Sequence, residues 1–227
     1  MDEEIFEITE DLMLDGLKIV QDKRYYRFTS DSILLSRFPV AKNGETVADF
    51  CSGSGIVGLH FYGLNKDKVK SVTFFELQKE LADLSQKSIE INGLESVFNL
   101  ECGKLQDAPD TYNEKFSLIL CNPPYKKKNS GEQGLSKHVA ICRHECEIML
   151  DEIIKTAKRL LKNGGRLCIC QRTERLTDLI AGLRQNGLEP FDMAMVRTKT
   201  GAPYLVIVQA AKGKKPQLKL RKEIING

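Results

Sequence analysis

Short apolar runs alternate with stretches of helical periodicity along most of the chain. The runs predict strands at 46–50, 69–75, 97–102, 116–121, 166–171, 191–196 and 204–210. The periodic stretches predict helices at 56–62, 78–92, 146–161 and 174–185. This alternation predicts an α/β fold, in which helices cover both faces of a mostly parallel, seven-stranded sheet with an antiparallel closing strand.

The first part of the chain departs from this alternation. Apolar and polar residues alternate loosely from Leu12 to Phe28 around Asp15-Gly16, which predicts a short hairpin, and a helix is expected before Pro39. The sequence contains no internal repeat and no low-complexity linker. We therefore expect a single domain over 1–227, with a hairpin and helix extension over 1–40, a catalytic core over 41–212 and a basic tail over 213–227.

A glycine-rich loop follows the first strand of the core. Asp49 ends that strand, and Cys51, Gly53 and Gly55 follow it. Glycines suit a loop where backbone must turn with positive φ or approach a ligand, and the amides of the next helix can receive an anion. No Gly-Lys-Ser/Thr closes the run, so it is not a phosphate-binding P-loop. The spacing to Gly58 also fits a dinucleotide-binding loop, which keeps NAD open.

An acidic residue completes this candidate cofactor site. Glu76 ends the second core strand, 21 residues after Gly55. A carboxylate at this place can accept hydrogen bonds from both ribose hydroxyls of an adenosine cofactor. The loop and Glu76 together predict such a cofactor without choosing which one.

The fourth core strand leads directly into Asn122-Pro123-Pro124-Tyr125. Two prolines fix φ and make a stiff loop, so the asparagine amide oxygen and a backbone carbonyl can converge on one point. Two acceptors that hold the hydrogens of a planar amino group favour its pyramidal, nucleophilic form, and Tyr125 offers a flat face to a base. This pattern predicts methyl transfer to an amino nitrogen and leaves adenine, guanine, cytosine and glutamine amides open as targets.

Net charge and cysteine content bear on the partners and the cellular compartment of the protein. The net charge is +3, which permits a nucleic-acid partner without requiring one. No apolar run is long enough to span a membrane, and the acidic start does not resemble a signal peptide. Seven cysteines without a secretion signal suggest a reducing, cytoplasmic compartment. We expect no metal site, because Cys142, His144 and Cys146 lack the usual ligand spacing.

The loop, the acidic residue and the Asn-Pro-Pro-Tyr motif together resemble the class I, Rossmann-like N-methyltransferases. The resemblance implies S-adenosyl-L-methionine as the cofactor. The implied cofactor-binding residues are Phe28, Thr29, Asp49, Cys51, Gly53, Gly55, Glu76, Leu77 and Asn122. The sequence departs from the family's pattern at one position. These enzymes often carry an acidic residue after the third strand that holds the adenine amino group, and here Lys104 stands at that place. Asp107 is the candidate that could bind the adenine instead.

Four stretches in order resemble a narrower family, the bacterial tRNA1(Val) adenine-37 N6-methyltransferases. They are 15–19 with 26–35, the motif at 122–125, Arg143-His144-Glu145 and 202–212. The resemblance implies a cytoplasmic enzyme that methylates N6 of adenine 37 in a tRNA anticodon loop, with Asn122 to Tyr125 as catalytic residues. The implied substrate-binding residues are Tyr125, Lys126, Lys127, Lys128 and Arg143.

Other functions remain open from the residues alone. A ribosomal RNA guanine-N2 methyltransferase or a protein glutamine-N5 methyltransferase can use the same Asn-Pro-Pro-Tyr loop. The glycine spacing also allows an NAD-binding oxidoreductase or a nucleotide-binding module without catalysis. We expect a monomer without membrane attachment.

Overall fold

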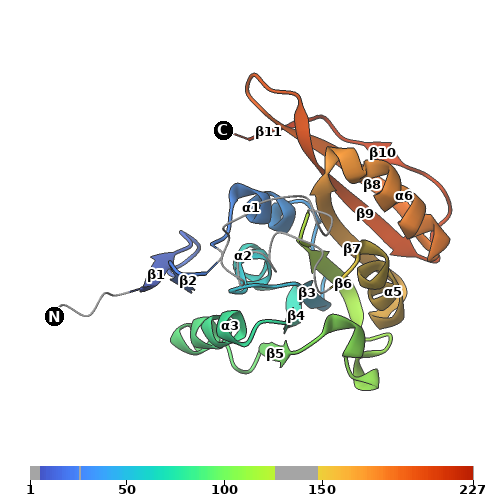
Figure 1. The fold of residues 1–227 in the computed structure, drawn as a ribbon. Helices are drawn as coiled ribbons and strands as arrows, with labels where there is room; N and C mark the ends of the chain where they lie inside the picture. Colours follow the sequence, from blue (N-terminus) through green and yellow to red (C-terminus); the bar gives the residue numbers. More distant parts are fainter. Residues whose placement is uncertain (1–5, 26, 126–147, 227) are drawn as a thin grey trace.

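The computed structural model describes residues 6–25, 27–125 and 148–226 of the 227-residue chain, and they form a layered α/β fold (Figure 1). The helices are α1 (Ser30–Arg37), α2 (Ile56–Leu64), α3 (Lys79–Ile91), α5 (Leu150–Leu160) and α6 (Leu176–Gln185). The core strands are β3 (Glu45–Phe50), β4 (Val69–Glu76), β5 (Phe98–Cys102), β6 (Phe116–Cys121), β7 (Leu161–Arg172), β8 (Leu188–Thr198) and β9 (Pro203–Lys212). Two strands, β1 (Glu7–Asp11) and β2 (Lys18–Asp22), precede them.

The core strands lie in the order β8-β9-β7-β6-β3-β4-β5. Neighbours from β7 to β5 are parallel, whereas β9 is antiparallel to both β7 and β8. The predicted α/β fold with its antiparallel closing strand is confirmed. The strand order reverses at β3, so a ligand crevice is expected beyond the carboxyl ends of β3 and β6.

Two buried clusters fill the space on the two faces of the sheet. Successive side chains of a strand point to opposite faces. Val47 and Leu118 accordingly join the cluster that includes residues of α1, α2 and α3, whereas Ala48 and Ile119 join the cluster that includes residues of α5 and α6. All four side chains are fully buried. Helices therefore cover both faces, as the alternation of apolar runs predicts.

The N-terminal hairpin starts earlier than the sequence suggests. Its strands are β1 and β2, and the stretch from Leu12 to Leu17 forms the turn between them. Leu12 and Leu14 contact the core cluster of α1 and α2 instead of taking strand positions, and Leu17 belongs to that cluster. The apolar residues Leu12, Leu14 and Leu17, which the alternating pattern assigns to strands, are thus turn residues that pack against the core.

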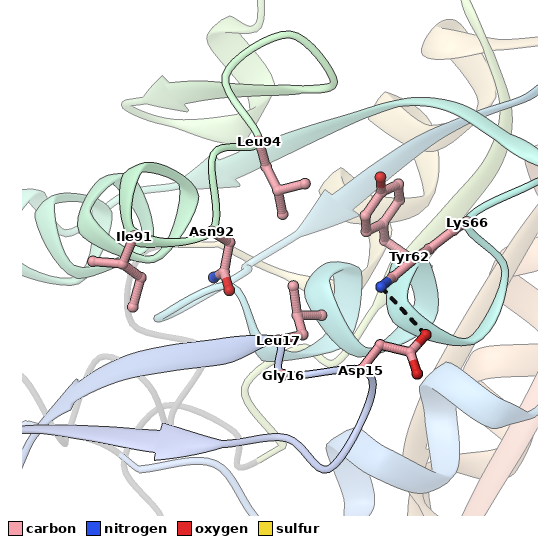
Figure 2. Close-up of a pocket in the computed structure, with 8 residues that line it drawn as sticks. All are labelled: Asp15, Gly16, Leu17, Tyr62, Lys66, Ile91, Asn92 and Leu94. Atoms are coloured by element: carbon pink, nitrogen blue, oxygen red, sulfur yellow. Dashed lines mark hydrogen bonds and ion pairs between the residues drawn. The ribbon is translucent and has the colours of Figure 1, made fainter.

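The hairpin is attached to α3 by side-chain hydrogen bonds. Val20 N donates to Ser88 Oγ at 2.9 Å, and Lys18 N donates to Asn92 Oδ1 at 2.9 Å. Where the hairpin turn meets the ends of α2 and α3 there is a pocket of about 270 Å³ (Figure 2). It is lined by Asp15, Gly16, Leu17, Tyr62, Lys66, Ile91, Asn92 and Leu94. This pocket lies at the helix ends that lead into the next strands, away from the carboxyl ends of the strands.

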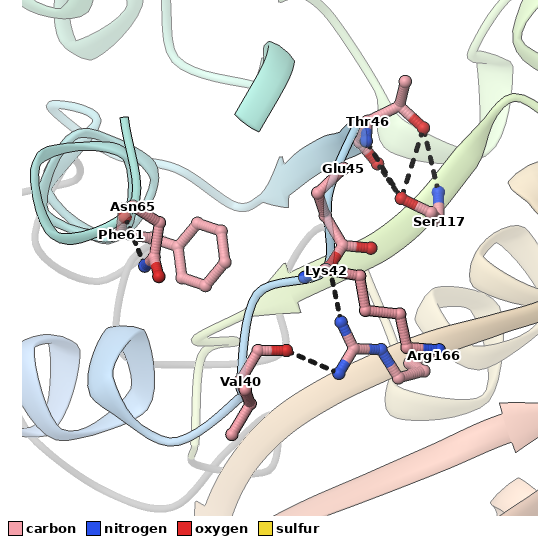
Figure 3. A network of polar contacts seen from close by, with 8 residues as sticks. All are labelled: Val40, Lys42, Glu45, Thr46, Phe61, Asn65, Ser117 and Arg166. Carbon is pink, nitrogen blue, oxygen red and sulfur yellow. Dashed lines mark hydrogen bonds and ion pairs between the residues drawn. The ribbon is translucent and has the colours of Figure 1, made fainter. Parts of the chain in front are cut away.

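A buried ion pair joins the start of β3 to the middle of β7. Arg166 Nη2 lies 2.6 Å from Glu45 Oε2, and its Nη1 donates to the carbonyl of Val40 at 3.0 Å (Figure 3). Both charged side chains are almost fully buried. The network ties the segment after α1 to the sheet at the edge opposite the expected crevice.

β7 begins five residues before its predicted start. Phe116 pairs with Leu161 and Leu118 pairs with Arg166, so the stretch from Asn163 to Gly165 forms a bulge in this strand. A Cβ on Gly165 would lie 2.8 Å from the carbonyl oxygen of Lys162. Glycine fits where this bulge brings two backbone segments together.

The basic stretch after β9 is not a frayed tail. It contains β10 (Lys219–Leu220) and β11 (Ile224–Asn226), which both pair in parallel with β8 and bring the sheet to nine strands within the described residues. The Arg221 guanidinium bonds Asp192 and lies 3.9 Å from the centre of the Phe38 ring. These contacts to residues far away in sequence hold the stretch against the sheet.

Candidate active site

The two predicted motifs directly follow the ends of two neighbouring strands, β3 and β6. Phe50, the last residue of β3, pairs with Cys121, the last residue of β6. Cys51 and Asn122 are therefore the first residues beyond two paired strand ends. The glycine-rich loop and the Asn-Pro-Pro-Tyr loop therefore meet at one edge of the sheet.

The glycine-rich loop turns sharply before α2. Cys51, Gly53 and Gly55 have φ values of 56°, 58° and 88°, in the left-handed region. A Cβ on Gly55 would lie 2.9 Å from the ring of Phe74. The third residue of the dinucleotide-like spacing, Gly58, also packs against this ring, where a Cβ would lie 2.6 Å from it. Glycine is thus required at 55 for both conformation and space, and at 58 for space.

Asp49 lies beneath this loop and is completely buried. Its Oδ2 accepts a hydrogen bond from Gly58 N at 2.8 Å. Its Oδ1 has no hydrogen-bond partner among the described residues, and the same holds for the buried Oγ of Ser52. Burial, together with the nearby charge of Glu76, raises the pKa of Asp49 to about 8, although the hydrogen bond from Gly58 acts in the opposite direction.

Glu76 holds the loop from the end of β4. One of its oxygens accepts from Gly53 N and the other from Gln78 N, both at 2.8 Å. Burial raises the pKa of this carboxyl group despite these bonds. Sequence reasoning assigned Glu76 to ribose alone and missed its contact with the loop. A carboxylate has about four acceptor positions, so hydroxyl groups can still bind it.

Asn122 is held by three side chains. Its Nδ2 donates to Ser32 Oγ of α1 at 3.0 Å. Its Oδ1 accepts from the hydroxyl of Tyr125 and from Cys170 Sγ of β7, which lies 3.1 Å away. Because burial raises the pKa of Cys170 to about 12, this group is a neutral thiol and donates. The amide oxygen therefore faces Tyr125 and Cys170, and it is a hydrogen-bond acceptor at this edge of the sheet.

Ser32 and Cys170 were not among the predicted site residues. Ser32 stands in the stretch 26–35, which sequence analysis singled out as a motif without assigning this side chain a role. Cys170 is one of two cysteines in the apolar run at 166–171. Neither signal indicates that both residues contact the same amide.

The remaining predicted residues fall into three groups. Phe28 and Thr29 directly precede α1, where Phe28 packs against the core cluster of α1 and α2, and Leu77 follows Glu76 as a half-buried side chain. Lys104 and Asp107 are exposed. The predicted substrate residues Lys126, Lys127, Lys128 and Arg143 lie outside the described residues, as do Cys142, His144 and Cys146.

Within the described ranges, no group of three or more His, Cys, Asp or Glu side chains is placed to hold a metal ion. None of the helices in these ranges is both long and apolar enough to cross a membrane.

The strand order, the glycine-rich loop at the carboxyl end of β3 and the acidic residue at the end of β4 define a Rossmann-like domain of the methyltransferase type. The chain belongs to the methyltransferase small domain family, which it matches over residues 29–183. The matched stretch includes both loops, Glu76 and Cys170.

Similar proteins agree with this assignment. A tRNA1(Val) (adenine(37)-N6)-methyltransferase from Shewanella sp. (strain W3-18-1) is 24% identical over 187 residues, which cover 80% of this chain and 76% of the relative. A protein of the same name from Flavobacteriaceae bacterium (strain 3519-10) is 25% identical over 153 residues, 66% of this chain but only 62% of that relative's length.

Solved structures share the fold. The crystal structure of a predicted O-methyltransferase, Atu636 from Agrobacterium tumefaciens, superposes with a TM-score of 0.66 at 19% identity, covering 86% of each chain. The structure of M. jannaschii TYW2 in complex with AdoMet gives a TM-score of 0.63 at 12% identity, covering 92% of this chain and 87% of that one. At these identities the likeness concerns the fold.

Proposed function

We propose that this protein is an S-adenosyl-L-methionine-dependent methyltransferase that acts on N6 of an adenine in tRNA, adenine 37 of the anticodon loop, in the bacterial cytoplasm. One observation supports methyl transfer to an amino nitrogen as the type of reaction. The amide of Asn122 is oriented by Ser32 so that its oxygen, and not its nitrogen, is presented as the acceptor. The names of the relatives from Shewanella and Flavobacteriaceae support the choice of substrate.

The residues beneath the glycine-rich loop fit a cofactor that carries an ammonium group and a ribose. Asp49 Oδ1 is a buried acceptor without a partner among the described residues, and an ammonium group of the cofactor would supply the missing donor. Glu76 keeps acceptor positions for the ribose hydroxyls, and a Cβ built on Gly53 would meet no atom within 4 Å, which leaves room beside the loop. The bound cofactor supplies a methyl group on a sulfonium, which is reactive toward a neutral amine.

The protein's own part in the reaction is to position the amine. Asn122 Oδ1 and the carbonyl of the proline that follows accept the two amino hydrogens, which favours the pyramidal nitrogen. The Tyr125 ring stacks on the base, and its hydroxyl leaves Oδ1 as the amine takes its place. No strong base is needed before attack, because the nitrogen loses its proton only after the methyl group has been attached.

Guanine-N2 and glutamine-N5 transfer use the same loop chemistry, so the geometry alone does not separate these targets from adenine. Mass spectrometry of tRNA nucleosides after incubation with the protein and cofactor tests the substrate. We expect N6-methyladenosine. Methylguanosine, or no methylated nucleoside in any tRNA, would refute the tRNA adenine assignment.

The catalytic role proposed for Asn122 has its own test. Asn122→Ala is expected to lower kcat by roughly 10²–10³-fold, the order found when one well-placed transition-state hydrogen bond is lost. Calorimetric titration with S-adenosylhomocysteine should give an unchanged Kd for this variant. Turnover at the wild-type rate would show that Asn122 is not catalytic, and binding of NAD without binding of S-adenosylhomocysteine would favour an oxidoreductase.

A further inference from the structure

Arg172 lies beside the catalytic loop and has no role in the site described so far. It is the last residue of β7, the strand next to β6. Its guanidinium carbon lies 5.1 Å from the centre of the Tyr125 ring and 5.5 Å from that of the Tyr204 ring. The side chain is half-buried, so a cation is held at the carboxyl end of the sheet, next to the ring that stacks on the target base.

The position of Arg172 is built by residues from three elements. Tyr204, from β9, bonds Asp31 Oδ1 of α1 at 3.1 Å through its hydroxyl. The same hydroxyl accepts from Asn226 Nδ2 of β11 at 2.6 Å. The Tyr204 side chain is therefore held in place by α1 and β11, and the guanidinium group of Arg172 packs on its ring through a cation–π contact.

The charge of Arg172 has no counter-charge in the part of the chain that the structure describes. Other arginines, such as Arg166, Arg184 and Arg221, each pair with a carboxylate within 4.0 Å, whereas no such pair forms at Arg172. The carboxylate of Asp31 contacts the adjacent Tyr204 but makes no ion pair with the arginine. A guanidinium group that lies against two aromatic rings can still offer its N–H edge to a bidentate acceptor such as a phosphate.

We propose that Arg172 is a positioning residue that binds a backbone phosphate of the RNA beside the nucleotide whose base enters the site. This inference rests on the proposed function in one respect, namely that the substrate is RNA. A base stacked on Tyr125 brings its own sugar-phosphate backbone to this edge of the site. A glutamine side chain of a protein brings no phosphate, so the residue distinguishes the two substrate classes.

The test measures binding of a fluorescent anticodon stem-loop RNA at several KCl concentrations, with S-adenosylhomocysteine present. Arg172→Met keeps the length of the side chain and removes its charge, whereas Arg172→Lys keeps the charge. Arg184→Met is the matched control, since Arg184 pairs with Glu189 near the end of α6, away from the site. Methylation kinetics of the same RNA are measured in parallel.

We expect Arg172→Met to weaken RNA binding by about tenfold at low salt and to make the slope of log K against log[KCl] shallower by roughly 0.7–0.9, the effect of one lost phosphate contact. Arg172→Lys should restore the slope, and Arg184→Met should match wild type. The affinity for S-adenosylhomocysteine should not change, and the KM for RNA should rise with little change in kcat.

Two results would overturn the inference. In the first, Arg172→Met weakens RNA binding with an unchanged salt slope, which means that the arginine only packs on the rings. In the second, the variant binds RNA like wild type, or wild type binds no RNA. If wild type binds RNA with the expected dependence on Arg172 but methylates none, the inference stands and the proposed function fails.

Discussion

Ser32 Oγ accepts a hydrogen bond from Asn122 Nδ2 at 3.0 Å, across 90 residues of sequence. An asparagine amide has a donor end and an acceptor end, so this bond helps to fix which end points to Ser32 and which end points away from it. Helix α1, which packs on α2 outside the strand-helix alternation, thereby contributes to the orientation of the Asn122 side chain. The N-terminal extension therefore reaches the candidate active site.

Ser32→Ala should lower kcat about tenfold, because the bonds from Tyr125 and Cys170 still favour the correct amide orientation and the loss is smaller than for Asn122→Ala. The Kd for S-adenosylhomocysteine should stay unchanged. Steady-state methylation and calorimetry measure the two quantities. A kcat equal to that of wild type would mean that Ser32 does not orient the amide.

Cofactor binding should release about one proton near pH 7. The pKa of Asp49 is raised to about 8, so its carboxyl group is mostly protonated at pH 7, and an ammonium group beside Oδ1 favours the charged form. Affinity should therefore rise as the pH increases from 6 to 8. Calorimetry in buffers of different ionisation enthalpy counts the proton, and Asp49→Asn should abolish its release. Equal heats in all buffers would contradict this prediction.

Breaking the buried pair of Glu45 and Arg166 should destabilise the fold without changing the chemistry. Arg166→Met leaves the Glu45 carboxylate buried without its partner, which costs roughly 3–5 kcal/mol. Urea unfolding measures the loss of free energy. The double variant with Glu45→Met should lose less than the sum of the two single changes. Because Glu45 lies at the start of β3, at the opposite end of that strand from the candidate active site, kcat of the folded Arg166→Met protein should match wild type.

His60 should make the protein sensitive to acid. It is buried in α2 with its Nδ1 2.8 Å from Ser36 Oγ of α1, and burial lowers its pKa to about 4 from a usual value of 6.5. A lowered histidine pKa means that stability is present above pH 6.5 and is lost as pH falls toward 4, by up to roughly 3 kcal/mol. Urea unfolding at several pH values should show this loss. His60→Gln should remove that part of the pH dependence, and an identical pH profile would refute the assignment.

Much of the fold and of the two loops could be predicted from local sequence. Apolar runs such as 116–121 become buried strands because parallel sheets covered on both faces exclude polar residues. Asn122 could be placed at the edge of the sheet because two prolines end the strand directly after it. Glycine spacing likewise located the turn before α2.

The contacts within the site could not be predicted in the same way. Cys170 reaches Asn122 from another strand, and nothing in its local sequence distinguishes it from Cys168. Arg172 follows an apolar run, as many surface arginines do, and only the packing of Tyr125 and Tyr204 gives it a defined place. Side-chain direction and long-range pairing determine these contacts, and neither is encoded in residue spacing.

The strands β10 and β11 also bear on how copies of this protein behave at high concentration. A long exposed edge strand offers unpaired backbone groups to another chain and promotes aggregation. Here the free side of β8 is taken up at two separate places by two short strands, with Arg221, Lys222 and Glu223 in the sequence between them. A short, interrupted border with charged residues at its centre is a poor template for another strand, so the stretch after β9 protects the sheet from edge-to-edge association.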